Sequence, residues 1–156
     1  MRLLSAVSFI LLMAGCAATL NSTQQIRLRE VELLRSQPTP SDWHPGSVWS
    51  FVQSGEDGSP VLKATFRVTD ESAETCSSGN WRALELVEGE VGDGSIQLTH
   101  AYSVSGRLLT LDLTGGCDFG QIQGALSDGS FLGQTTGGPT TYGKSVPKRV
   151  VGRRLY

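Results

Sequence analysis

The stretch PVLKATFRVT, residues 60–69, alternates apolar and polar side chains along its length. Its apolar residues share one face of an extended chain: Leu62, Ala64, Phe66 and Val68. The residues between them are polar or charged: Lys63, Thr65, Arg67 and Thr69. Because successive side chains of a β-strand point to opposite faces, this period of two predicts a strand with one buried face.

Seven further stretches are half apolar in the same way: 47–53, 81–88, 95–104, 107–114, 119–126, 130–136 and 148–156. Short segments rich in glycine join most of them. Strands with one apolar face suit an antiparallel meander, and eight strands can close on themselves and so lose their exposed edges. The sequence therefore predicts an all-β fold, a small eight-stranded up-and-down barrel over residues 46–156, with a two-sheet β-sandwich as the alternative.

The tripeptide Asp-Gly-Ser occurs three times near the predicted strand ends, at residues 57–59, 93–95 and 128–130. Aspartate and glycine both tolerate positive φ, so this pair is typical of tight hairpin turns. Calcium also prefers such oxygen ligands, but the alternating acidic residues of a calcium loop are missing. We therefore interpret the three tripeptides as turns and expect no metal site.

A short helix is expected before the barrel. Ser22 and Gln25 have the spacing of a capping box, and apolar residues recur every third position from Leu28 to Leu34. Pro38 and Pro40 then end the pattern, because proline cannot continue a helix. The sequence predicts a helix over residues 24–36 that follows a flexible tether.

The first fifteen residues have the features of a secretory leader. Arg2 precedes an apolar run over residues 3–13, which is shorter than the roughly 20 residues that a membrane-spanning helix needs. The run ends in Leu12-Met13-Ala14-Gly15-Cys16, which resembles the lipobox of bacterial lipoproteins. That resemblance implies cleavage after Gly15 and acylation of Cys16.

The same resemblance implies a location. Ala17 and Ala18 follow the cysteine, where an aspartate would signal retention in the inner membrane. We therefore expect an outer-membrane lipoprotein that faces the periplasm and is held by its lipid anchor. The expected organisation is a signal peptide over 1–15, a lipidated tether with a short helix over 16–45, and the barrel over 46–156.

Charge is unevenly distributed along the chain. Removal of the leader takes away one of 13 basic residues and none of the 15 acidic ones, so 12 against 15 leave a formal charge of −3. This charge argues against a nucleic-acid partner. Residues 56–93 hold nine acids, whereas residues 144–156 hold five basic residues and no acid. The basic stretch is either a solvated strand face or a patch that meets an anionic partner or lipid headgroups.

Two cysteines, Cys76 and Cys117, remain once Cys16 is acylated. In an oxidising compartment we expect them to form a disulfide, which would contribute roughly 3–4 kcal/mol to stability. Three predicted strands separate them, and an odd number would leave them at opposite ends of a strict meander. Either the strand over 95–104 breaks near His100, which we favour, or the 70–80 loop runs back along the barrel wall.

The ends of the predicted barrel carry a second resemblance. Gly46-Ser47-Val48-Trp49 and Arg153-Arg154 are similar to the first and last strands of lipocalin-like barrels. In that family a late arginine packs on the indole of the first strand. The resemblance implies architecture only, and no ligand.

No nucleophile elbow, zinc-protease motif or phosphate-binding loop is present in the sequence. His44 and His100 are the only histidines, and we interpret His100 as a core residue. We therefore expect a protein that is not an enzyme and has no cofactor. The function predicted is a binding module for a small ligand or envelope component; the alternative is a periplasmic inhibitor or immunity protein that blocks a hydrolase. A polar loop supplies the expected contact rim: Thr140, Thr141, Tyr142 and Lys144.

Overall fold

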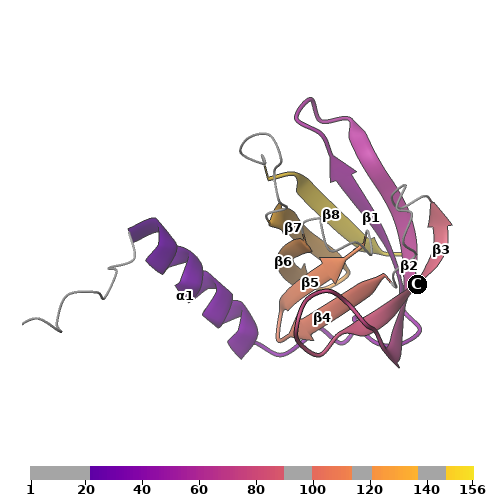
Figure 1. Ribbon diagram of the computed structural model, residues 1–156, viewed down its shortest axis with the longest axis horizontal. Helices are drawn as coiled ribbons and strands as arrows, with labels where there is room; N and C mark the ends of the chain where they lie inside the picture. Colours follow the sequence, from indigo (N-terminus) through magenta and orange to yellow (C-terminus); the bar gives the residue numbers. More distant parts are fainter. Residues whose placement is uncertain (1–21, 90–99, 114–120, 137–146) are drawn as a thin grey trace, which may run out of the picture. The chain divides into compact units, whose positions relative to one another are not determined.

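Eight strands pair in sequence order, each antiparallel to the next, and the last pairs with the first to close a barrel (Figure 1). The computed structural model describes residues 22–89, 100–113, 121–136 and 147–156. Its elements are α1 (Ser22–Ser36), β1 (Val48–Ser54), β2 (Pro60–Ser72), β3 (Arg82–Gly89), β4 (Ala101–Ser105), β5 (Leu108–Asp112), β6 (Gln121–Ser127), β7 (Ser130–Thr136) and β8 (Arg149–Arg154). The predicted barrel is confirmed, and the sandwich is excluded.

The strand boundaries follow the period of two in the sequence. β2 contains the whole of the 60–69 stretch, with Ala64, Phe66 and Val68 buried and Lys63 exposed. Thr65, which is expected on the outward polar face, is also buried. The strand predicted over 95–104 is described only from Ala101 onward, because residues 90–99 lie outside the described part. Two of the predicted turns are seen, with Gly58 at φ 81° and Gly129 at φ 68°.

The turn at Asp57 is held by its own side chain. Asp57 Oδ1 accepts hydrogen bonds from the hydroxyl of Ser59 at 2.6 Å and from its backbone N–H at 3.0 Å. These two bonds favour the ionised carboxylate and lower the pKa of Asp57, with the hydroxyl making the larger contribution. The third Asp-Gly-Ser tripeptide, residues 93–95, lies outside the described residues.

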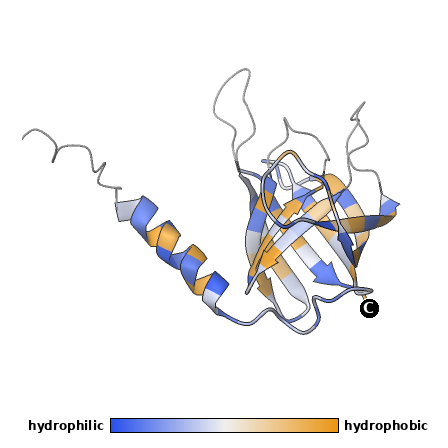
Figure 2. Ribbon diagram, turned by 60° about the horizontal axis from the view of Figure 1, so that its bottom comes forward, coloured by the Kyte–Doolittle hydropathy of each residue, from blue (hydrophilic) through white to orange (hydrophobic). Residues whose placement is uncertain are grey.

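Side chains fill the interior of the barrel. Apolar residues are concentrated on the strands (Figure 2), and the inward-facing ones form a single core cluster. Phe51 packs against Phe66 and Phe131 at ring-centroid distances of 6.3 and 5.8 Å. All three rings are at most 1% exposed. The centre of the barrel is therefore occupied by phenylalanine rings.

Residues 37–47, here called the N-terminal strap, lie across one end of the barrel. The hydroxyl of Thr39 donates to the carbonyl of Gly106 in the β4–β5 turn, and Asp42 accepts a hydrogen bond from the backbone of Gly129 in the β6–β7 turn. Trp43 enters the core and is only 6% exposed. The centroid of its ring lies 5.1 Å from the ring centroid of Trp49 and 5.3 Å from that of Tyr102. The strap therefore closes this end with an indole.

The compact unit that contains the barrel begins at Val31 and runs to the C-terminus, whereas the part of α1 before Val31 belongs to a separate unit. The last turn of α1 belongs to the barrel unit. There the carbonyl of Leu34 accepts a hydrogen bond of 2.8 Å from the backbone of Arg107. Gly106 lies so close to this turn that a Cβ would overlap the carbonyls of Leu34, Arg35 and Gln37.

Candidate functional site

Most residues that the sequence suggested for function lie outside the described part of the chain: Cys16, Cys117, Thr140, Thr141, Tyr142 and Lys144. Cys76 is described. It lies in the connection between β2 and β3, and its sulfur is not a free thiol. The lipid anchor, the pairing of Cys76 with Cys117 and the contact rim therefore remain predictions.

The connection between β2 and β3 bears on the expected disulfide. Ser77 follows Cys76 directly, and its hydroxyl accepts a hydrogen bond of 2.5 Å from the side-chain amide of Gln121, the first residue of β6. This contact brings the connection to the strand that follows Cys117 in the sequence. It agrees with the second of the two expected routes, in which the loop runs back along the wall. The favoured break near His100 stays a prediction, because β4 begins at Ala101 and residues 90–99 lie outside the described part.

His100 lies beside the core. Its Nδ1 is 2.7 Å from the carbonyl oxygen of Leu113, and its ring packs edge-on against Phe66 at 5.2 Å. The other histidine, His44, contacts the carbonyl of Pro45. Among the described residues no three histidine, cysteine or acidic side chains gather where they could hold a metal ion.

The lipocalin-like features are placed as follows. Gly46 has φ 91° and precedes β1, in which Trp49 is completely buried. Arg154 is paired with Trp49 across β1 and β8. In the described residues the ring that packs on the Trp49 indole is that of Trp43, and the Trp49 Nε1 donates to the hydroxyl of Ser47 at 3.1 Å.

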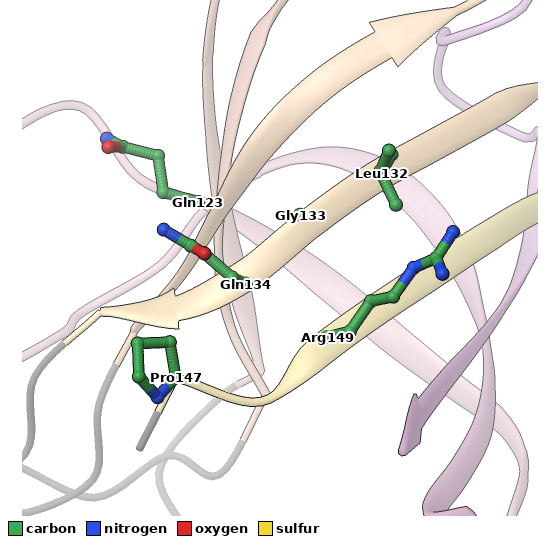
Figure 3. Close-up of a pocket in the computed structure, with 6 residues that line it drawn as sticks. All are labelled: Gln123, Leu132, Gly133, Gln134, Pro147 and Arg149. Atoms are coloured by element: carbon green, nitrogen blue, oxygen red, sulfur yellow. The ribbon is translucent and has the colours of Figure 1, made fainter. Parts of the chain in front are cut away.

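The outer wall formed by β6, β7 and β8 carries a groove. Strand pairing places Gln123 opposite Gln134 and Gln134 opposite Arg149, so these three side chains form one row across three strands. They face outward because Ile122, Phe131 and Val150, which alternate with them along the strands, belong to the core. The groove has a volume of about 440 Å³ and is lined by Gln123, Leu132, Gly133, Gln134, Pro147 and Arg149 (Figure 3).

A second row, two residues along the strands, is apolar. It consists of Ala125, Leu132, Val151 and Val52, which strand pairing joins in that order from β6 to β1. Leu132 is 53% exposed, and Arg149 extends beside it (Figure 3). The groove therefore combines a polar row of two carboxamides and one guanidinium with an apolar edge.

The wall that contains the groove has no acidic residue on its strands. β6, β7, β8 and β1 hold neither aspartate nor glutamate, whereas β8 holds Arg149, Arg153 and Arg154. The nearest acids in sequence lie in the flanking turns, and no acid follows Asp128. The other strands carry both signs of charge: β2 and β3 hold four acids and three basic residues (Asp70, Glu71, Glu85 and Glu88 with Lys63, Arg67 and Arg82), and β5 holds Asp112. The basic stretch noted in the sequence thus belongs to a wall whose strands carry arginine and no acid.

The arginines of β8 have no ionic partner among the described residues. The ion pairs found there join Arg35 to Glu32, Arg67 to Glu85 and Arg107 to Asp128. Arg149 is exposed in the groove. Such a site can donate hydrogen bonds to an anion, and each carboxamide can both donate and accept.

This groove could not be identified from the sequence. Gln123, Gln134 and Arg149 are distant in sequence and become neighbours only through the register of β6, β7 and β8. The sequence offers one indication of such a site, the basic C-terminal stretch. That stretch is compatible with a patch for an anionic partner, but also with a solvated strand face.

Comparison with known proteins supplies no further assignment, because no protein family, curated protein or solved structure matches the chain significantly. In the part of the chain that the structure describes, no helix has the length and apolar character to span a bilayer.

Proposed function

We propose that this chain is a lipid-anchored, periplasm-facing outer-membrane lipoprotein that acts as a non-catalytic binding module. The anchor rests on the sequence Leu12-Met13-Ala14-Gly15-Cys16. A disulfide between Cys76 and Cys117 is part of this proposal, because both cysteines would lie in an oxidising compartment. The contact between Ser77 and Gln121 supports that pairing.

One observation carries the binding role: the groove on the outer wall lies on strands without a single acidic residue. Its volume falls within the range of small-molecule sites, about 300–1,000 Å³. The core of phenylalanine and tryptophan rings argues against the other possibility, a ligand carried inside the barrel. We therefore assign binding to the outside of the barrel.

The alternative function, inhibition of a periplasmic hydrolase, also has an observation in its favour. A barrel whose core is filled and whose end is closed by Trp43 is a rigid support for loops. Rigid loops lose little conformational entropy when they bind. In that case the contact residues would be those of the predicted rim, such as Tyr142, and not those of the groove.

Photo-crosslinking in a bacterial host tests the proposal. A photoreactive amino acid is placed at Gln134 in the groove, at Tyr142 in the predicted rim, or at Val87, an exposed residue of β3 that serves as the control. We expect an adduct with an envelope component from position 134 and none from position 87. An adduct with a hydrolase from position 142 alone would select the inhibitor. Adducts from none of the positions would contradict a binding role.

A further inference from the structure

We propose that the groove binds the carboxyl-terminal end of a short peptide, with the free carboxylate on Arg149 and the amide groups over Gln134 and Gln123. This inference rests on the proposed function and names the ligand class of the same site. The argument has three steps, which concern the charge of the ligand, its amide groups and its size.

The charge of the site selects an anion. Arg149 is exposed, has no ion pair within the described residues, and stands on a wall whose strands carry no acid. Its guanidinium presents a planar pair of N–H donors, which matches a carboxylate in a bidentate arrangement. Since Arg149 is the only charged residue among the described residues that line the groove, a single negative charge on the ligand is sufficient.

The two glutamines select amide groups. Each carboxamide offers a donor and an acceptor, which is the complement of a peptide group. Gln134 is the strand partner of both Gln123 and Arg149. Neighbouring strands lie about 4.8 Å apart, so the row spans roughly 10 Å from the guanidinium to the second amide. An extended chain rises about 3.3 Å per residue, and three residues therefore cover the row.

The shape of the site accommodates small side chains. Leu132 and Pro147 provide apolar surface at the edges, and the backbone of Gly133 lies between Leu132 and Gln134. Methyl-sized side chains would pack against this surface, whereas the groove is too open to enclose a large ring. A short peptide of small residues with a free carboxyl end meets all three requirements.

Titration of the full-length protein in detergent micelles, labelled with ¹⁵N-glutamine, tests the inference. The probes are acetyl-Ala-Ala-Ala with a free carboxylate and the same peptide with a carboxamide end. We expect the free acid to shift the side-chain amide signals of Gln123 and Gln134 in a saturable manner. The amide-ended peptide should bind at least tenfold more weakly, because it lacks the charge that Arg149 recognises.

Three variants make the test specific. Arg149→Gln should weaken binding of the free acid at least tenfold, whereas Arg153→Gln should change it less than twofold. Arg153 lies on the same face of β8, two outward positions beyond Arg149, and does not line the groove. Arg149→Lys should give an intermediate affinity, because lysine keeps the charge and loses the planar pair of donors.

The inference would be overturned if the two peptides bound equally well, or if Arg149→Gln and Arg153→Gln lost the same affinity for the free acid. Displacement of the peptide by an equal concentration of inorganic phosphate would overturn it as well. Absence of binding by the free acid would also overturn it. If the peptide test fails but position 134 still forms an adduct in the photo-crosslinking experiment, the proposed ligand class is wrong and the proposed function stands. If the peptide test fails and position 134 forms no adduct, both the ligand class and the proposed function are wrong.

Discussion

The rings of Phe51 and Phe131 occupy the space beside Gly152 inside the barrel. A Cβ at Gly152 would lie 2.7 Å from Cε1 of Phe51 and 3.0 Å from Cβ of Phe131. At Gly124, by contrast, a Cβ would overlap backbone atoms of Leu132 and Gly133 on the neighbouring strand. Gly152 therefore leaves space for phenylalanine side chains, which can shift. Gly124 leaves space for the backbone of β7, which cannot shift without separating the strands.

Alanine substitutions separate these two cases. Gly152→Ala should lower the free energy of unfolding by about 1–3 kcal/mol, the usual cost of overpacking. Gly124→Ala should cost more, because relief requires β6 and β7 to move apart. Urea unfolding at neutral pH measures both, and Phe51→Leu should recover part of the loss in the Gly152 variant only. A change below 0.5 kcal/mol for Gly124→Ala would contradict the close approach of the strands.

Tyr102 links the core to the pH dependence of stability. Its hydroxyl donates to the carbonyl of Thr69 at 2.8 Å, and burial, the largest effect, raises its pKa above the usual value of 10.0. Nearby Arg82 lowers the pKa and Asp70 raises it, both to a smaller extent. As the pH rises above 10, the unfolded chain loses this proton before the folded one does. Stability is therefore lost as the pH rises through the pKa of the folded state.

Tyr102→Phe should remove this dependence. At pH 8 the variant should be less stable by about 1 kcal/mol, since it loses one hydrogen bond and leaves an acceptor unpaired. Between pH 9 and 11 its stability should fall less steeply than that of the parent protein. Urea unfolding at several pH values measures both effects, and parallel curves for the two proteins would show that Tyr102 does not titrate with unfolding.

At the scale of the elements, the strands could be predicted from the sequence and the strap could not. Alternation over 60–69 and its repeats specifies which face of each strand is buried, and closure follows from eight such strands. Trp43 lies in a segment with prolines on both sides and no periodicity, so no local pattern indicates that it enters the core. The groove is equally hidden, because the pairing of β7 with β8 spans residues 137–148 and determines which side chains meet.

Removal of the Trp43 indole tests the role of the strap. Trp43→Ala should lower the free energy of unfolding by about 3–5 kcal/mol, the range for a buried tryptophan in a core. Leu33→Ala is the control, because Leu33 lies on α1 and is 60% exposed, and it should change stability by less than 0.5 kcal/mol. Similar unfolding midpoints for Trp43→Ala and the parent protein would mean that the strap does not close the barrel.

At the scale of the whole molecule, acidic residues are absent from the strands on one side of the barrel. β2 and β3 carry four acids and three basic residues, the strands from β6 to β1 carry no acid, and the formal charge of the whole chain is −2. The net charge of the chain therefore does not show how charged residues are distributed around the barrel. A lipid anchor at Cys16 would keep such a barrel at an envelope surface, where a weak, exposed groove still encounters its ligand at high local concentration.

The mass of the intact protein, purified from a bacterial host with its native leader, tests the central claim most directly. We predict that residues 1–15 are absent and that Cys16 carries a diacylglyceryl group and an amide-linked acyl chain. The remaining mass should be two hydrogens below that of the reduced chain, as a disulfide between Cys76 and Cys117 requires. An unmodified thiol at Cys16, with the leader either present or removed, would contradict the account.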